Sequence, residues 1–376
     1  METTQCLASD ASAKPRARDL GLPFSGKTGS YNAITDVAGV EVGYSTVISD
    51  APASGRGPAR TGITAILPRG RSGPLRAPVW AGFHSLNGNG EMTGTHWIKE
   101  AGYFTGPIAI TNTHSLGTVH QSILEWMIYK PNPGFGPYKF ILPVVGETSD
   151  AYLNDMDAFH VTGTHVKEAL DGASSGPLAE GNVGGGTGMI CFEFKGGTGT
   201  SSRIVDLLGS PYTIGCLVQA NFGIRPLLKI LGVPVGEHLT SNRLFAGEQG
   251  SIIAVLATDA PLMPTQLERV ARRAGLGIGR TGTPVGDGSG DLCLAFSTAN
   301  LTASESATAP AVGHLAFLPN NRLDPLFEAT AQAVEEAIIN AMVAAESMVG
   351  QEDRLVAAIE HDAVKEVMRN YGRLNV

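Results

Sequence analysis

An uninterrupted apolar run, Ile252 to Ala257, directly follows a polar segment that ends in Gly250 and Ser251. A run of this length, rich in Ile and Val and preceded by turn residues, predicts a buried strand. Ser251 is therefore expected to begin a central strand. Glycine lacks a Cβ, so Gly250 can adopt unusual backbone angles and leaves its carbonyl open to attack. Ser251 is thus a candidate nucleophile, although a loop-to-strand junction without any chemical role is the common alternative.

Other apolar patterns predict a mixture of strands and helices. Strands are expected at Thr61–Pro68, Val79–Phe83, Pro107–Asn112, Ile141–Gly146, Tyr212–Asn221 and Leu292–Ser297, with an early hairpin over Asn32–Gly43. Helices are expected at Thr95–Ala101, Val119–Tyr129, Val161–Leu170, Thr265–Ala274 and Leu355–Met368, and from Asp324 through Met348. The strands come in pairs and the helices in groups, which favours an α+β arrangement in which helices cover sheets.

Composition limits the partners that the chain can have. It carries 27 Lys and Arg against 35 Asp and Glu, a formal charge of −8, so nucleic acid is not expected as a partner. No apolar stretch is long enough for a transmembrane helix, and no membrane partner is expected. The polar residues 1–18 lack the apolar core of a secretory signal and predict a mobile tail on a cytoplasmic protein. Residues 19–376 are expected to form one catalytic domain.

The cysteines and glycines add two expectations about packing. Cys191, Cys216 and Cys293 are scattered and are expected to pack as small core residues. The 48 glycines and the low content of charged residues favour a homo-oligomer, which is expected to be a tetramer.

The densest glycine run, Gly181–Gly188, raises the possibility of a nucleotide-binding loop. A P-loop requires a Lys after its last glycine, and this run continues with Thr187 and Gly188 instead. A glycine-rich nucleotide-binding protein without hydrolytic chemistry nevertheless remains the rival hypothesis. The glycines otherwise let backbones pass closely around a site or an interface.

The histidines do not predict a metal site or a hydrolase triad. Neither His114/His120 nor His160/His165 has the spacing of a helical zinc pair, and the chain has no Gly-x-Ser-x-Gly motif. No metal and no cofactor are therefore expected. A serine without a histidine can still act when it is the first residue of a chain, because its own α-amine serves as the general base. Cleavage between Gly250 and Ser251 would create such a residue.

Three further residues are candidates for the same site. Gly288–Asp291 places Ser289 and Asp291 just before a predicted strand, where a second hydroxyl and a carboxylate could lie beside Ser251. Asn221 ends its predicted strand and could stabilise an oxyanion. Each also has a plain alternative, since Ser-Gly-Asp is a common turn and Asn221 can simply end a strand.

Several segments together resemble a known family, the L-aminopeptidase D-amidase/D-esterase family, which includes the bacterial β-aminopeptidases. The segments occur in this order: Asn32–Val37, Arg60–Pro68, Ser85–Glu91, Gly184–Met189, Val218–Gly223, Gly250–Ile253 and Gly288–Asp291. The resemblance implies a four-layer α/β/β/α sandwich, similar to the N-terminal-nucleophile hydrolases but with different connectivity. It also implies a precursor that cleaves itself into an α chain, here 1–250, and a β chain, 251–376.

The resemblance assigns roles to residues of this chain. It implies that Ser251 is the nucleophile, that Ser289 and Asp291 assist, and that Asn221 contributes the oxyanion hole. Glu147 corresponds to the carboxylate that receives the free amine of the substrate; the alternative is a solvated turn residue. Some β-aminopeptidases have Glu where Asp291 stands, and the related ornithine acetyltransferases use Thr as the nucleophile. The expected substrates are short peptides, amides and esters, including D-Ala amides and esters.

Overall fold

The structure is a computed structural model that describes residues 14–52, 55–129, 141–207, 209–248, 250–301 and 312–374. Its largest sheet has six strands in the order β4-β3-β12-β11-β10-β9. In chain order these strands are β3 (Val79–Gly88), β4 (Tyr103–Phe104), β9 (Gly197–Leu207), β10 (Ser210–Asn221), β11 (Ser251–Thr258) and β12 (Gly290–Ser297). Strands β11 and β12 are parallel, and the other neighbours are antiparallel. The predicted central strand is therefore confirmed, with Ser251 as its first residue.

A second sheet packs face to face against the first. Its order is β1-β2-β5-β6, and its strands are β1 (Glu41–Ser49), β2 (Ala59–Leu67), β5 (Ile108–Asn112) and β6 (Val144–Thr148). There are also two small two-stranded sheets: β7 (Ile190–Cys191) with β8 (Phe194–Lys195), and β13 (Met348–Val349) with β14 (Leu355–Val356).

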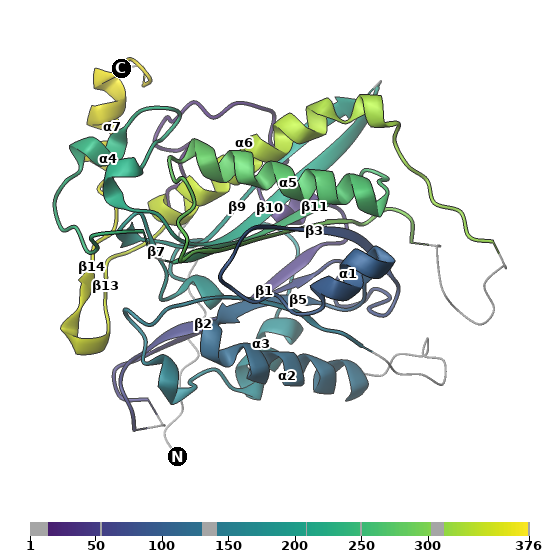
Figure 1. Cartoon of the computed structure of the whole chain (residues 1–376), viewed down its shortest axis with the longest axis horizontal. Coiled ribbons are helices and arrows are strands. Elements are labelled where there is room, and N and C mark those ends of the chain that lie inside the picture. The colour runs from purple at the N-terminus through teal and green to yellow at the C-terminus, as the bar shows by residue number, and fades with distance from the viewer. Residues whose placement is uncertain are drawn as a thin grey trace.

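Helices cover the outer face of each sheet (Figure 1). Helices α5 (Pro264–Arg280) and α6 (Asp324–Val343) lie on the six-stranded sheet, and α2 (Leu116–Tyr129) and α3 (Gly163–Asp171) lie on the other. The remaining helices are α1 (Thr95–Ala101), α4 (Val235–His238) and α7 (His361–Asn370). The layers run α/β/β/α, which confirms the predicted four-layer sandwich. No helix within the described residues is long and apolar enough to cross a bilayer.

Strand β11 is buried on both faces because it lies in the middle of this sandwich. Ile253 and Val255 belong to the core between the two sheets, whereas Ile252 and Ala254 belong to the core beneath α5 and α6. Successive side chains of a strand point to opposite faces. Ser251 consequently shares a face with Ile253 and points toward the second sheet.

The N-terminal boundary of the folded part lies earlier than predicted. Residues 1–13 are outside the described residues, but 14–18 pack against the domain and do not form part of a mobile tail. Ala17 is fully buried and its N–H donates to Asn340 Oδ1 at 2.9 Å. Arg16 Nε lies 2.6 Å from Glu180 Oε2, and Arg18 Nε lies 2.8 Å from Glu336 Oε1.

Several predicted elements begin or end elsewhere. The segment Asn32–Gly43 is not a hairpin, because it contains a 3₁₀ turn at Ile34–Asp36 and only then enters β1. Helix α5 continues past Gly275 to Arg280, and α6 ends at Val343, before Met348. The final helix starts at His361, after the short strand β14. Cys191, Cys216 and Cys293 are free and buried, as predicted; Cys6 lies outside the described residues.

Candidate active site

Ser251 is held between two neighbouring strands at the end of the sheet. It pairs with Asn221 of β10 on one side and with Gly290 of β12 on the other. The Gly290 N–H donates a hydrogen bond to Ser251 Oγ at 2.9 Å, and the residue is only 8% exposed. This bond uses a lone pair of the hydroxyl and leaves its hydrogen free to be transferred. This hydrogen bond therefore fixes the side chain and still allows its oxygen to act as a nucleophile.

Gly250 adopts a backbone conformation that requires glycine. Its φ is +104°, in a region that other residues rarely occupy. A Cβ built on Gly250 would lie 1.8 Å from the carbonyl oxygen of Asn221 and 3.3 Å from Asn221 Nδ2. The peptide that precedes Ser251 is thus pressed against the end of β10, with the amide of Asn221 beside it.

Two hydrogen bonds orient the side-chain amide of Asn221. Oδ1 accepts from the Ile190 N–H at 2.8 Å, and Nδ2 donates to the Ser149 carbonyl at 2.9 Å. Nδ2 carries two hydrogens, so one remains available on the side of Gly250. An amide held in this way is a candidate donor to an oxyanion on the Gly250 carbonyl.

Ser289 and Asp291 form a buried pair on either side of Gly290. Ser289 Oγ donates to Asp291 Oδ1 at 2.9 Å. Burial raises the pKa of Asp291 to about 6; the bond from Ser289 opposes this rise, and the nearby charge of Glu248 adds to it. Within the described part of the chain, neither side chain hydrogen-bonds the hydroxyl of Ser251. The structure joins them to Ser251 through Gly290, so the predicted cluster is present but the contact is indirect.

Two asparagines, Asn87 and Asn89, lie eight and six residues before α1 and hold the loop that carries Ser289. Asn87 Nδ2 donates to the Gly286 carbonyl at 3.0 Å, and Asn89 Nδ2 donates to the Gly288 carbonyl at 2.8 Å. Reasoning from the residues did not single out these side chains. They lie in the segment Ser85–Glu91 that contributes to the family resemblance, and β3 continues to Gly88, past the predicted strand end at Phe83.

Glu147 lies inside strand β6. The sequence had predicted that the strand would end at Gly146 and that Glu147 would follow it. Its pairing with Thr111 of β5 extends the strand to Thr148. The side chain is 5% exposed, so the alternative of a solvated turn residue is wrong. Oε1 accepts from the Glu91 N–H at 2.8 Å, and Oε2 accepts from Thr113 Oγ1.

Gly90 connects Glu147 with the serine cluster. A Cβ built on Gly90 would lie 3.1 Å from Gly290 Cα and 3.3 Å from Glu147 Oε1. The carboxylate and Gly290 therefore lie on adjacent sides of one glycine, and Gly290 contacts Ser251. The second sheet thereby brings a negative charge close to the candidate nucleophile of the first.

A buried lysine supports the segment that orients Asn221. Lys195 Nζ donates to the carbonyls of Met189 at 2.8 Å and Gly196 at 3.0 Å. Burial lowers the pKa of Lys195 to about 7. Met189 directly precedes Ile190, whose N–H binds the Asn221 side chain, so Lys195 fixes the backbone behind this amide. Sequence reasoning missed this residue because its partners are backbone carbonyls.

The glycine run Gly181–Gly188 does not form an open phosphate-binding loop. Gly184–Gly186 is a buried 3₁₀ turn. A Cβ on Gly185 would lie 2.2 Å from Gln219 Oε1, and one on Gly186 would lie 2.2 Å from the Thr198 nitrogen. The space that a phosphate would need is already filled by protein, which argues against the nucleotide-binding hypothesis.

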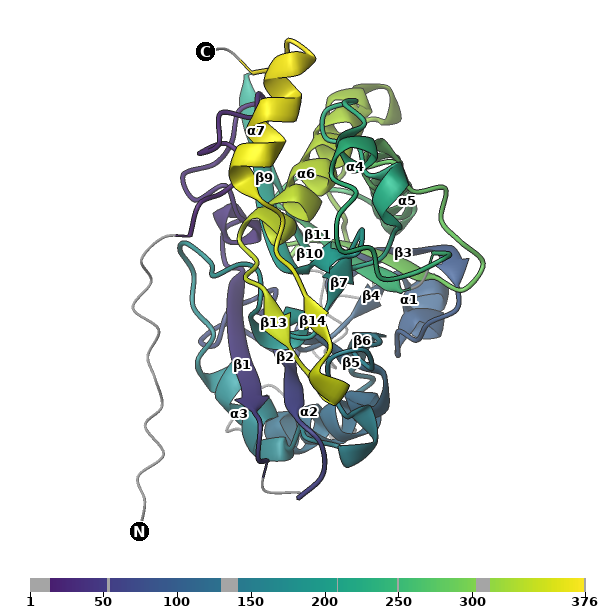
Figure 2. The same ribbon diagram turned by 90° about the vertical axis from the view of Figure 1, so that its left-hand side faces the viewer.

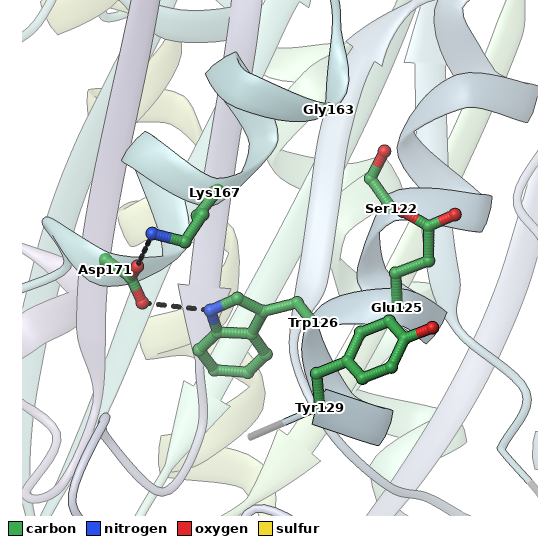
Figure 3. A pocket seen from close by; sticks show the side chains of 7 residues that line it. All are labelled: Ser122, Glu125, Trp126, Tyr129, Gly163, Lys167 and Asp171. Atoms are coloured by element: carbon green, nitrogen blue, oxygen red, sulfur yellow. Dashed lines mark hydrogen bonds and ion pairs between the residues drawn. The ribbon is translucent and has the colours of Figure 1, made fainter.

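The described residues contain no group of three or more His, Cys, Asp or Glu that could hold a metal ion. A hollow of ≈ 370 Å³ lies on the outer helical layer between α2 and α3 (Figure 3). There Asp171 accepts from Trp126 Nε1 at 2.9 Å and pairs with Lys167 at 3.3 Å. None of the candidate catalytic residues lines this hollow.

Known proteins that are similar to this chain along most of its length are peptidases. The model of peptidase family S58 matches residues 32–356. A beta-peptidyl aminopeptidase from Sphingosinicella microcystinivorans is 49% identical over 98% of this chain and 96% of its own. The structure of L-aminopeptidase D-Ala-esterase/amidase from Ochrobactrum anthropi, described as a prototype of the serine aminopeptidases and a variant of the Ntn hydrolase fold, matches with a TM-score of 0.90. It is 51% identical and covers 96% of this chain and 100% of its own. A Burkholderia sp. beta-aminopeptidase matches with a TM-score of 0.88 at 42% identity, over 95% and 99% of the two chains.

Proposed function

Because the chain belongs to peptidase family S58, and is therefore a serine peptidase related to aminopeptidases, we propose that it activates itself by cleaving the Gly250–Ser251 bond. The observation that carries the proposal is the junction itself. A glycine at φ +104° is pressed against Asn221 and is followed by a buried serine whose hydroxyl is held by Gly290. The products are an α chain, 1–250, and a β chain, 251–376.

Self-cleavage begins with attack of Ser251 Oγ on the Gly250 carbonyl carbon. The C–O bond forms, the C–N bond breaks, and the hydroxyl proton passes to the departing nitrogen, which becomes the α-amine of Ser251. Asn221 Nδ2 donates to the oxyanion; a donor of this kind contributes about 2.7–4 kcal/mol. Water then hydrolyses the ester, giving the Gly250 carboxylate and a free Ser251.

Turnover repeats this chemistry on an external substrate. The freed α-amine, with an ordinary pKa of about 7.7–8.0, accepts the proton from Ser251 Oγ. The hydroxyl attacks the substrate carbonyl, the amine or alcohol leaves, and water hydrolyses the acyl-enzyme. Ser289 and Asp291 assist at the free amine of Ser251, and Glu147 receives the ammonium group of the substrate. No metal or cofactor takes part in the scheme.

The proposed substrates are short peptides, amides and esters with a free N-terminus. The relatives named above include both beta-peptidyl aminopeptidases and an L-aminopeptidase with D-Ala-esterase/amidase activity. The proposed substrates include both kinds, and the proposed oligomeric state is a homotetramer of αβ units. An acid at position 291 one methylene shorter than Glu bears on the choice between α- and β-amino substrates.

The test of the proposal is the Ser251→Ala variant, because one hydroxyl performs both attacks. Wild type is expected to give two bands on denaturing electrophoresis, the smaller beginning at Ser251, with alanine-amide hydrolysis. The variant is expected to give one intact band and no hydrolysis. Ser251→Cys tests the mechanism further, since a thiol can also cleave. Separate α and β chains in the Ser251→Ala variant would overturn the assignment.

A further inference from the structure

Glu248, two residues before Gly250, is bound to the loop that carries Ser289. Its carboxylate oxygen Oε1 accepts a hydrogen bond from Thr283 Oγ1. The Thr283 oxygen itself accepts from the Val285 N–H at 2.9 Å, which leaves the hydroxyl hydrogen to point at Glu248. Thr283 is 5% exposed, so water competes little for this bond.

The loop around Thr283, which supplies the donor of this hydrogen bond, is tightly packed. Glu248 also packs against Gly286, where a Cβ would lie 3.2 Å from both its Cβ and Oε2. The Gly286 carbonyl is held by Asn87, as described above. A Cβ at Gly282 would lie 1.7 Å from the Leu227 carbonyl oxygen, so the start of the loop is packed against backbone. Thr283 therefore offers a fixed anchor close to the scissile bond.

We propose that Glu248 and Thr283 form a maturation clamp, which positions the Gly250 carbonyl for self-cleavage but has no role in later turnover. This inference rests on the proposed self-cleavage. In the uncut chain Glu248 is covalently tied to Gly250, so holding one restrains the other. Small misplacements of a reacting carbonyl lower rates strongly. After the cut, the substrate brings its own carbonyl to Ser251, and the clamp no longer holds a reacting atom.

The experiment measures the two reactions separately in each variant. Pulse-labelled chains from cell-free translation give the half-life of the precursor on denaturing gels. Hydrolysis of an alanine amide, divided by the amount of β chain, then gives kcat/KM of the matured enzyme. Thr283→Val and Glu248→Ala each remove the hydrogen bond. Both are expected to lengthen the precursor half-life about tenfold or more. Thr283→Val, which keeps the Glu248 charge near Asp291, is expected to leave kcat/KM per β chain within about twofold of wild type.

Three controls distinguish positioning from folding and from charge. Thr283→Ser restores the hydroxyl and is expected to restore the maturation rate. Thr281→Val removes a neighbouring buried hydroxyl that bonds the Ile278 carbonyl instead, so it is expected to lower Tm without slowing maturation. Glu248→Gln keeps an acceptor oxygen but removes the charge near Asp291, and it is expected to mature faster than Glu248→Ala.

The proposal is overturned if Thr283→Val matures at the wild-type rate, or if maturation and kcat/KM fall together. It is also overturned if Glu248→Gln is as slow as Glu248→Ala, since the charge and not the hydrogen bond would then be responsible. Failure of the proposed function is a separate result: the wild-type precursor itself would yield no chain that begins at Ser251.

Discussion

At the scale of single residues, the site depends on a glycine whose conformation and surroundings both exclude a side chain. Gly250 combines φ +104° with a 1.8 Å approach of its would-be Cβ to the Asn221 carbonyl. Any side chain here must move the scissile peptide away from Asn221 and Ser251. Position 250 is therefore expected to control self-cleavage through geometry, although Gly250 supplies no catalytic group.

Gly250→Ala is accordingly expected to slow self-cleavage at least a hundredfold, because the carbonyl must shift away from the attacking oxygen. The measurement is the fraction of intact chain over time on denaturing gels. Gly247→Ala is the matched control, since a Cβ at Gly247 meets no atom within 4 Å and the backbone there is not left-handed. Equal processing by both variants would contradict the geometric argument.

Glu147 is expected to read the free amine of the substrate. Glu147→Gln keeps the shape of the side chain and removes its charge, which is worth about 1.5–3 kcal/mol in a hydrogen bond to a charged partner. We expect kcat/KM for an alanine amide to fall about ten- to a hundredfold and self-cleavage to continue, because the Gly250–Ser251 step involves no free amine. The N-acetyl amide should barely change. Equal losses on both substrates, or none, would show that Glu147 does not recognise the amine.

At the scale of elements, helices α5 and α6 approach closely where α5 has a glycine. A Cβ on Gly277 would lie 2.6 Å from Val334 Cβ and 2.7 Å from the Ala331 carbonyl oxygen. Gly279, two residues further along the same helix, is exposed and has open space around it. Close packing therefore requires glycine at position 277 but not at position 279, a difference that the sequence alone does not show.

Gly277→Ala is expected to lower the free energy of unfolding by about 1–3 kcal/mol, since the helices must separate to admit a methyl group. Gly279→Ala is expected to leave it unchanged or raise it by up to about 1 kcal/mol, because alanine favours helix. Urea unfolding of both variants in the uncut Ser251→Ala chain measures the difference. Similar effects of the two substitutions would refute this account of the helix contact.

Local patterns predicted most elements, and long-range contacts explain where they failed. The helix Thr95–Ala101 and the strand that begins at Ser251 follow from spacing and apolar runs alone. The hairpin predicted at Asn32–Gly43 failed because the Ile34 N–H finds its partner in Thr200 Oγ1, 2.8 Å away and 166 residues later. Helix α5 passes Gly275 because its packing on α6 outweighs a local stop signal.

The site was predictable to the extent that its residues end or begin strands. Asn221 and Gly290 flank Ser251 because β10 and β12 are the strands next to β11, and this brings Ser289 and Asp291, on either side of Gly290, to the same end of the sheet. Glu147 was reached only through family resemblance, because its strand belongs to the other sheet. Lys195 and Thr283 act through a backbone carbonyl or another side chain, and no spacing in the sequence marks such partners.

At the scale of the whole molecule, one buried carboxyl group, that of Asp150, is expected to make stability depend on pH. Asp150 is 1% exposed and accepts a hydrogen bond from Asn154 Nδ2 at 2.9 Å. Burial raises its pKa to about 7, against the opposing hydrogen bonds of Thr61, Asn154 and Asn112. The folded protein thus binds a proton here more readily than the unfolded chain, whose Asp has a pKa of about 3.9.

Asp150 is therefore expected to contribute stability at low pH that is lost as the pH rises from about 4 to about 7. The slope is at most about 1.4 kcal/mol per pH unit for one such group. Asp150→Asn cannot titrate, so its free energy of unfolding should rise relative to that of the parent chain across this window. Urea unfolding at several pH values, in the uncut Ser251→Ala chain, tests this, with Asp50→Asn at an exposed carboxylate as the control. Parallel profiles of parent and Asp150→Asn chains would contradict it.

The order of strands in the six-stranded sheet has a consequence for how the mature enzyme can be made. In the proposed two-chain enzyme, β11 and β12 come from the smaller chain and lie between β10 and β3 of the larger one. Strands β10, β11 and β3 are labelled in Figure 2. Two ladders of backbone hydrogen bonds, β10–β11 and β12–β3, therefore join the two chains. The uncut chain assembles this sheet within one molecule, whereas separated fragments would have to meet by diffusion. Maturation then makes folding a one-way event, and the working lifetime of the enzyme is set by how slowly it unfolds and not by an equilibrium with its unfolded chains.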